Sequence, residues 1–414
     1  MAIHPIICAL RRHKAGVLLI VLQIALTLAI VCNAIFIIAQ RMERVERPTG
    51  AQEAGLIRIS QTWLDAPDGD GTATVEALDA LQRTDLATLR QLPDVLDVAA
   101  SDSMPLQGAI WSADLRLKPD QRHASTQAAL YYGDQHMLPT LGLRLIAGRN
   151  FTSSEIDHHT IRSTKAAPVV IVTKAVADSM FPNGDALDKT IYLDVRPSTI
   201  VGIVERLQTP TVAPWGNRWA YNSILLPVRL DGSSASYALR VRPGRERAVI
   251  RAARAALFAL NPVREMPDTW GIQTMQQIRS KAYRGDRGTA ILLGTVCVIL
   301  LCVTAAGIVG LTSFWVDQRR RQIGIRRALG ARRIDILHYF QIENLLIAGA
   351  GVVLGVLLAA VISFWLMTHY AMPRMPLSYL LAGVLVMLGL GQAAVFVPAR
   401  RASNVPPVVA TRSV

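Results

Sequence analysis

An arginine-rich segment at 319–336 has the most distinctive side-chain chemistry in the chain. It contains seven arginines (Arg319, Arg320, Arg321, Arg326, Arg327, Arg332 and Arg333) and, among its apolar residues, four candidate anchors (Ile323, Ile325, Leu329 and Ile334). Guanidinium groups bind acidic protein surfaces and lipid headgroups, and apolar side chains anchor protein interfaces. The pattern therefore predicts a docking surface for a protein partner. The alternative is that the arginines only keep this segment on the cytoplasmic side of a membrane.

Metal or catalytic chemistry has weaker support in the sequence. Glu155, Asp157, His158 and His159 are metal-ligating residue types, but adjacent histidines on a polar segment are typical of a solvated loop. The chain contains neither the nucleotide-binding pattern G-x-x-x-x-G-K-[ST] nor a recognisable Ser/His/Asp or Cys/His arrangement. We therefore expect no metal ligands, no catalytic residues and no cofactor bound by this chain.

Glu343 and Asn344 lie at the edge of a long apolar run. A carboxylate inside a membrane is by default a functional candidate. At the edge of a span, however, Glu343 can pair with Arg332 or Arg333 or reach water. Structural pairing is the favoured interpretation.

Four long apolar runs must position these residues. The chain has 414 residues, of which 51% are hydrophobic and 18% charged. The apolar residues concentrate at 16–39, 288–316, 344–368 and 377–397, and each run is long enough to cross a ~30 Å hydrocarbon core as a helix. The first run exceeds the ~7–15 apolar residues of a cleaved signal peptide, so a retained signal anchor is favoured. Small residues in the third run, such as Gly349 and Gly351, would let helices approach closely.

The charge distribution predicts the orientation of these runs. Residues 41–285 hold 29 Lys/Arg and 26 Asp/Glu, whereas the rest of the chain holds 15 Lys/Arg and 4 Asp/Glu, so most of the net charge of +14 flanks the apolar runs. Short cytoplasmic loops collect Lys and Arg. We therefore expect 1–15, 317–343 and 398–414 in the cytoplasm, and 40–287 and the turn 369–376 outside. Flanking arginines are also the reason that no nucleic acid is expected as a partner.

The large region between the first two runs is predicted to be a mixed α and β domain. Helix and strand patterns at 81–100 recur at 236–260, which indicates a split domain with an insertion at about 131–221. All four cysteines (Cys8, Cys32, Cys297 and Cys302) lie in or near the apolar runs, so no disulfide is expected in this domain. Polar segments at about 40–47 and 272–287 are predicted to continue the membrane helices as a stalk, the alternative being two flexible linkers.

Residues 322–336 resemble the signature cytoplasmic segment of FtsX/MacB-type ABC transporter permeases, although Gln322 stands where the family has an acidic residue. The segment 398–402 (Pro-Ala-Arg-Arg-Ala) is similar to the same family. Weaker similarities follow in the family's order at 141–151, 169–181 and 189–204. Asp188 replaces a glycine that is usual in the family, so the turn there is expected to have a different shape.

The resemblance implies a type VII permease with four transmembrane helices and a large extracytoplasmic α+β domain between the first two helices. A split Porter-like subdomain with an inserted Sabre-like subdomain would form that domain. The resemblance also implies a dimer with a second copy or a paralogue. Two copies of an ABC ATPase would supply ATP and Mg²⁺, and only about 15 residues precede the first span, so this ATPase is expected to be a separate chain. The docking set for it is Ile323, Gly324, Arg326, Ala328, Leu329, Gly330, Ala331, Arg332 and Ile334, with a helix break near Gly330.

The function implied by the resemblance is mechanotransmission, in which ATPase motion passes through the inner membrane to a periplasmic domain and drives efflux of periplasmic substrates. A periplasmic adaptor and an outer-membrane channel would be further partners, and the lipid bilayer surrounds the spans. Two alternatives remain open: lipoprotein release of the LolCDE type, and an FtsX-like regulator of a periplasmic partner. The sequence identifies no substrate.

Overall fold

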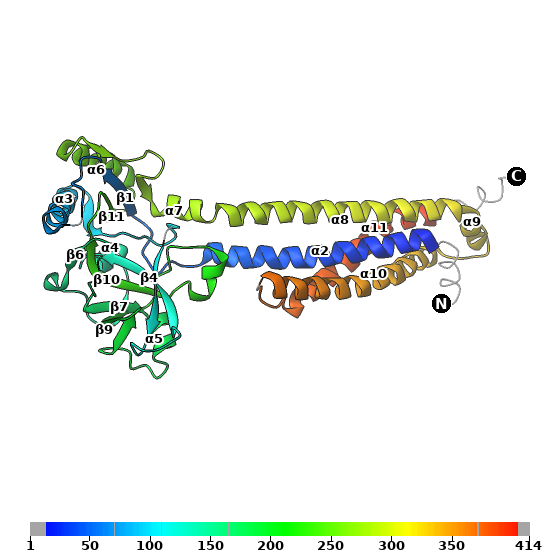
Figure 1. Cartoon of the computed structure of the whole chain (residues 1–414). Helices are drawn as coiled ribbons and strands as arrows, with labels where there is room; N and C mark the ends of the chain where they lie inside the picture. Colours follow the sequence, from blue (N-terminus) through cyan, green and yellow to red (C-terminus); the bar gives the residue numbers. More distant parts are fainter. Residues whose placement is uncertain are drawn as a thin grey trace. The chain divides into compact units, whose positions relative to one another are not determined.

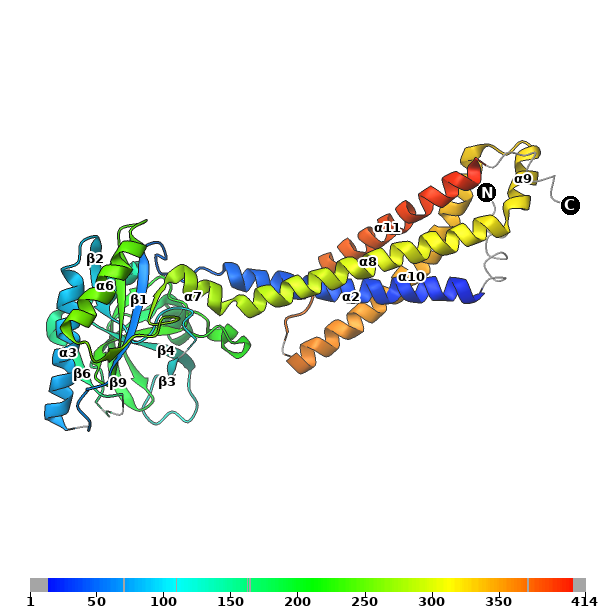
Figure 2. The same ribbon diagram turned by 90° about the horizontal axis from the view of Figure 1, so that it is seen from above.

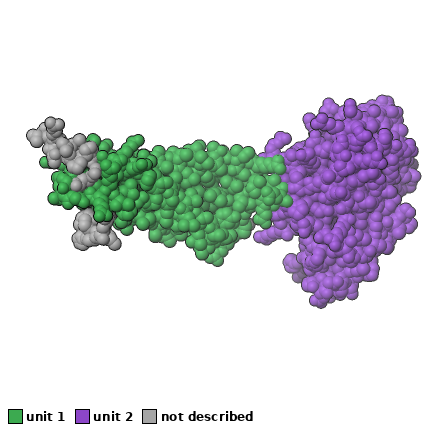
Figure 3. Space-filling view, turned by 180° about the vertical axis from the view of Figure 1, so that it is seen from behind, with its two compact units in different colours: residues 1–46, 285–414 green, residues 47–284 purple. Residues whose placement is uncertain are grey.

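The computed structural model of the protein describes residues 14–69, 71–108, 110–161, 163, 165–370 and 372–404. The chain divides into two compact units, which are coloured separately in Figure 3. Unit 1 consists of 1–46 and 285–414, and unit 2 of 47–284. The predictions for the two ends of the chain, 1–15 and 398–414, fall largely on residues outside the described ranges.

Unit 1 is built from long apolar helices. They are α2 (Lys14–Glu46), α8 (Arg284–Gln318), α10 (Arg333–Tyr370) and α11 (Leu377–Ser403), and the short α9 (Arg320–Ala328) lies between α8 and α10 (Figures 1 and 2). Among the described residues, these four long helices are sufficiently long and apolar to cross a membrane. Each extends beyond the apolar run that predicted it, because the polar residues at its ends continue the helix.

Helix α2 is the centre of unit 1. Ile24 and Leu28 on α2 are fully buried, and both contact the glycine face of α10. The hydroxyl groups of Thr27 and Thr304 lie 2.8 Å apart and join α2 to α8. By contrast, Ile291 and Leu292 on α8 are exposed, as expected for a helix face that meets lipid tails.

The first sheet of unit 2 draws its strands from widely separated parts of the chain. Its strands are β1 (Leu56–Trp63), β2 (Val95–Ala100), β11 (Ser234–Val241), β12 (Arg264–Glu265) and β13 (Ile272–Thr274), in the order β12-β1-β11-β2 with β13 beside β1. Helices α3 (Thr72–Arg90) and α6 (Glu246–Leu260) pack on it through a shared apolar core that includes Leu89 and Leu257. This sheet is therefore split by the segment that follows β2.

The second sheet of unit 2 lies in that intervening segment. Its eight strands are β3 (Trp111–Arg116), β4 (Thr126–Gly133), β5 (Leu145–Gly148), β6 (Asp157–His159), β7 (Val169–Thr173), β8 (Thr190–Leu193), β9 (Arg196–Val204) and β10 (Ser223–Leu230). The sheet runs from 111 to 230, beyond the 131–221 predicted for the insertion, because β3 and β4 pair with β8 and β10. Two short helices complete this part, α4 (Met137–Leu141) and α5 (Lys174–Met180).

Two local expectations can be compared with this architecture. Asp188 adopts a φ of +59°, in the left-handed region that glycine favours. The aspartate therefore has the backbone conformation that a glycine would take in this turn. The expected change of turn shape is therefore not required by the residue type. Helix covers 40–46 and 284–287, whereas β13 and the helix α7 (Met275–Ala282) occupy most of 272–283. The four transmembrane helices and the large α+β domain between the first two confirm the predicted fold class.

Candidate partner-docking site

The arginine-rich segment forms a helix, a turn and the start of another helix. α9 ends at Ala328, and α10 begins at Arg333. Gly330 between them has a φ of +95°, which only glycine adopts without strain. The carboxylate of Asp335 accepts a 2.9 Å hydrogen bond from the backbone N–H of Arg332 and so caps the start of α10. The helix break expected near Gly330 is present.

Two members of the predicted docking set face the interior. Ile323 is 6% exposed and belongs to the apolar core of unit 1, and Gly324 is also buried. As the structure stands, both residues contact the core of unit 1 and not the surface, and their part in docking stays a prediction. Their position instead holds α9 against unit 1. Ile325, two residues further on, points the other way and is 46% exposed.

The remaining members lie at the surface around the turn. Leu329 is 83% exposed and Ile334 is 55% exposed, both large values for apolar side chains. Among their neighbours in the predicted set, Arg326, Ala328, Gly330 and Arg332 are exposed and Ala331 is half-buried. An exposed apolar surface surrounded by cations is what an acidic protein surface or a lipid headgroup layer would complement. We call Ile325, Leu329 and Ile334 the apolar tip.

Two contacts between side chains fix the turn to the long helices. Nη1 of Arg319 lies 3.0 Å from each carboxylate oxygen of Glu343, which joins the end of α8 to α10. The guanidinium carbon of Arg326 lies 5.2 Å from the centre of the Tyr339 ring, a cation–π contact that joins α9 to α10. A displacement of the turn would therefore act on α8 and α10 together.

The partner of Glu343 differs from the one predicted. Arg332 and Arg333 were expected, but Arg333 precedes Glu343 by ten residues on the same helix, about 15 Å along its axis. Arg319 lies instead in the turn between α8 and α9. The role of Tyr339 was missed altogether, because no spacing in the sequence links it to Arg326.

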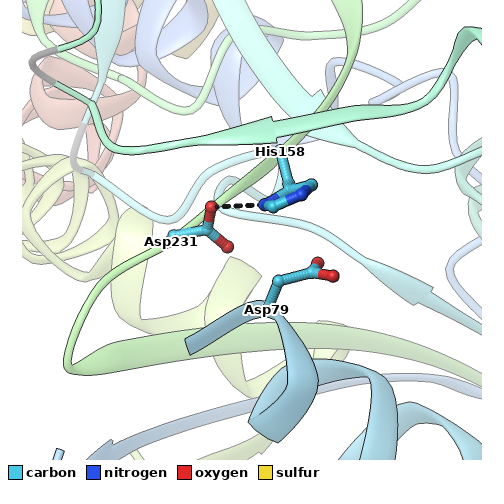
Figure 4. A group of neighbouring side chains, drawn as sticks. All are labelled: Asp79, His158 and Asp231. Atoms are coloured by element: carbon cyan, nitrogen blue, oxygen red, sulfur yellow. Dashed lines mark hydrogen bonds and ion pairs between the residues drawn. The ribbon is translucent and has the colours of Figure 1, made fainter. Parts of the chain in front are cut away.

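A second polar cluster lies in unit 2, where Asp79, His158 and Asp231 place possible metal-ligating atoms within 4.8 Å of one another (Figure 4). Asp79, however, is already neutralised, since Arg229 lies 2.6 Å from one of its oxygens and Arg83 lies 2.7 Å from the other. Two guanidinium groups at this distance oppose the binding of a cation.

The cluster has a structural explanation instead. His158 Nδ1 lies 3.0 Å from Asp231 Oδ2, and burial raises the pKa of that carboxyl. Gln82 on α3 donates a 2.5 Å hydrogen bond to the backbone oxygen of Leu230. These contacts join α3, which covers the first sheet, to β6 and the end of β10 in the second. Glu155 and Asp157, which the sequence placed beside the histidines, pair elsewhere, with Arg149 and Lys165.

Comparison with known proteins gives matches over nearly all of this chain. The model of the MacB-like periplasmic core domain matches residues 17–257, and that of the FtsX-like permease C-terminal region matches 294–407. The macrolide export ATP-binding/permease protein MacB of Neisseria gonorrhoeae is 27% identical over 297 residues, which cover 69% of this chain and 44% of that protein. The chain thus matches less than half the length of this relative.

Two further similar proteins differ in length and in the extent of the match. An uncharacterized ABC transporter permease of Bacillus subtilis, YvrN, is 25% identical over 292 residues, 68% of this chain and 69% of that protein. The crystal structure of the periplasmic region of MacB from Actinobacillus actinomycetemcomitans has 16% identity and a TM-score of 0.35, and covers 58% of this chain and 97% of that one. The core-domain match alone exceeds half of the chain. The protein therefore belongs to the family of ABC transporter permeases that join a MacB-like periplasmic core domain to an FtsX-like C-terminal permease region.

Proposed function

We propose that this protein is the permease subunit of an ATP-driven exporter and that an ABC ATPase docks on the turn between α9 and α10. The apolar tip carries this proposal. Leu329, Ile325 and Ile334 are large, exposed apolar side chains beside several arginines, and a soluble partner with an apolar pocket and an acidic rim would complement them. The ATPase is a separate chain in this proposal, and it supplies ATP and Mg²⁺.

The route of transmission follows from the contacts at the turn. Movement of the docked partner acts on α8 through Arg319 and on α10 through Glu343. α8 then runs without a break from Gln318 back to Arg284, which is the last residue of unit 2. A helix of 35 residues is about 52 Å long, and such a rigid element transmits displacement along its axis. The MacB-like domain is the proposed receiver of that displacement.

The proposed assembly contains two permease chains, as copies or paralogues, and two ATPase subunits. It lies in the inner membrane with both chain ends and the α9–α10 turn in the cytoplasm, and unit 2 in the periplasm. The arginines around the turn support this orientation. The cargo in this proposal is a periplasmic substrate, and an adaptor with an outer-membrane channel would complete the export route.

Acidic substitutions at the apolar tip test the docking proposal. In a complex of the full chain and its ATPase in lipid nanodiscs, Leu329→Asp with Ile334→Asp should abolish ATPase binding and the stimulation of ATP hydrolysis. The matched control is Val195→Asp, which places the same acid at an exposed apolar position (67% exposed) in unit 2. Membrane insertion should be unchanged in both variants. Normal hydrolysis in the double variant would contradict docking at this turn.

A further inference from the structure

Two chain crossings connect the two units. The chain passes from unit 1 to unit 2 between Glu46 and Arg47, and returns between Arg284 and Gly285. Any displacement that the backbone conveys to unit 2 has to pass through these two crossings. If they moved independently, sliding of α8 past α2 would be absorbed at the crossings instead of reaching the sheets.

An ion-pair clamp joins the two segments on the unit 1 side. Asp286, at the start of α8, accepts hydrogen bonds from Arg41 at 2.5 Å and from Arg44 at 2.8 Å, both near the end of α2. The Asp286 side chain is only 11% exposed, so water screens this group weakly. The two arginines are one helical turn apart and hold one carboxylate between them.

A second clamp joins the same two segments on the unit 2 side. Arg279 on α7 binds Glu53 with two parallel contacts, Nη2 to Oε1 at 2.5 Å and Nε to Oε2 at 2.9 Å. Its Nη2 also donates to the backbone oxygen of Arg47 at 3.0 Å. The Thr49 hydroxyl donates to Glu53 Oε1 at 2.8 Å. Two-point guanidinium–carboxylate pairs fix direction as well as distance.

The segment after the first crossing is anchored to the first sheet of unit 2 and to the loop between β9 and β10 of the second. The backbone oxygen of Thr49 accepts from the N–H of Gln208 at 2.7 Å, in the part that carries the second sheet. On the first sheet, Nη1 of Arg240 donates to the backbone oxygens of Gln52 and Ala54, each at 2.7 Å. A displacement that enters at 47 would therefore act on β11 of the first sheet directly and on the loop between β9 and β10 of the second, which a flexible linker would not permit.

We infer that Asp286 and Glu53 are positioning residues that make the two crossings move as one mechanical link. The Asp286 clamp joins α2 to α8 on the unit 1 side of the crossings. The Glu53 clamp joins the segment that begins at 47 to α7 on the unit 2 side. This inference rests on the proposed function, because it names the residues through which ATPase motion would reach the MacB-like domain. Removal of either clamp should uncouple unit 2 from hydrolysis without stopping hydrolysis.

The test begins with isosteric variants of the full chain in nanodiscs. Asp286→Asn and Glu53→Gln remove one charge each without changing size, and the matched controls are Asp178→Asn and Glu205→Gln, which remove exposed ion pairs with Lys174 and Arg144. Amide hydrogen exchange at 40–54 and 279–290 is measured without ATPase. We expect about tenfold faster exchange in the clamp variants and no change in the controls, since a lost tertiary contact lowers the local opening free energy.

The second measurement uses the complex with the ATPase. We expect nucleotide-dependent changes of exchange in β1 and β11 for the unaltered chain, and their loss in the clamp variants at unchanged ATP hydrolysis. A full response of unit 2 in both clamp variants, or exchange rates equal to those of the controls, would overturn the inference. If nucleotide does not change amide exchange in β1 and β11 of the unaltered chain, the proposed function is contradicted. The exchange rates measured without ATPase then decide by themselves whether the clamps exist.

Discussion

Arg319 and Glu343 are 24 residues apart in the sequence, yet one guanidinium nitrogen lies 3.0 Å from both carboxylate oxygens. The Glu343 side chain is 2% exposed and that of Arg319 is 13% exposed. A carboxylate in such surroundings depends on its cation, because neither water nor lipid tails can solvate the charge. The pair therefore fixes how α8 lies against α10 beside the docking turn.

Removing the cation alone should be the most damaging change at this pair. Arg319→Gln removes a guanidinium group that lies 3.0 Å from both oxygens of the buried carboxylate, and should lower the free energy of unfolding in detergent by about 3 kcal/mol. Arg319→Gln combined with Glu343→Gln should be more stable than Arg319→Gln alone, since no uncompensated charge remains. The measurement is a double-mutant cycle from denaturant unfolding of the full chain. Strictly additive losses would show that the two residues do not interact energetically.

Local features of this site were predictable from the sequence. Ile323 and Ile325 are two residues apart, so one helix face cannot hold both, and the structure indeed buries one and exposes the other. Gly330 predicted the break because it is the residue that adopts a positive φ at lowest cost. The partner of Glu343 was not predictable, because it depends on how α8 and α10 align in space.

Long-range pairing limited the prediction of unit 2 in the same way. The buried ion pair of Asp85 with Arg264 joins residues 179 positions apart, and only the pairing of β1 with β12 brings Arg264 to the sheet that α3 covers. The start of the inserted sheet was missed because β4 pairs in parallel with β10, whose residues follow about a hundred positions later. Alternation within a strand carries no information about such a partner.

Gly50 should be far less tolerant of alanine than Gly184. Both have similar positive φ values, +85° and +83°. A Cβ at Gly50 would lie 2.2 Å from the backbone oxygen of Arg206, whereas nothing lies within 4 Å of a Cβ at Gly184. Gly184→Ala should cost only the left-handed conformation, about 1 kcal/mol, and Gly50→Ala clearly more. Thermal unfolding of unit 2 in the full chain measures the loss of stability in both variants. Equal losses would contradict the close approach of Gly50 to the backbone oxygen of Arg206.

Acid should weaken unit 2 partly through Glu155. Hydrogen bonds from Arg149 are the main cause that lowers the pKa of Glu155 from 4.5 to about 2, and the backbone N–H of Thr152 adds another. The unfolded chain thus binds the proton more tightly than the folded one. The stabilisation is complete above about pH 4.5 and is lost as the pH falls towards about 2.

Variants at this pair separate its contribution from that of other carboxylates. Glu155→Gln should flatten the dependence of unfolding free energy on pH between about 4.5 and 2, and Arg149→Gln should do the same because it removes the main cause. Chemical unfolding at a series of pH values measures the slope. An unchanged slope in Glu155→Gln would mean that the pair does not lower this pKa in solution.

Two glycines of α10 should respond to alanine with opposite signs. A Cβ at Gly351 would lie 2.8 Å from Cβ of Ile24 on α2, and 3.0 Å from the backbone oxygen of Val21, so the two helices would have to separate. Overpacking of this kind costs about 1–3 kcal/mol. At Gly349 nothing lies within 4 Å of the added carbon, and the greater helix propensity of alanine should stabilise the helix by up to ~1 kcal/mol.

The comparison of these two variants isolates packing from propensity, since they make the same substitution two residues apart on one helix. In unfolding of the full chain by a denaturing detergent, the free energy of unfolding should be lower for Gly351→Ala than for the unaltered protein. For Gly349→Ala it should be equal or higher. Glycine at 351 would then be required because α2 and α10 meet there with their backbones in near contact. A gain of stability in Gly351→Ala would mean that α2 and α10 do not approach this closely in the membrane.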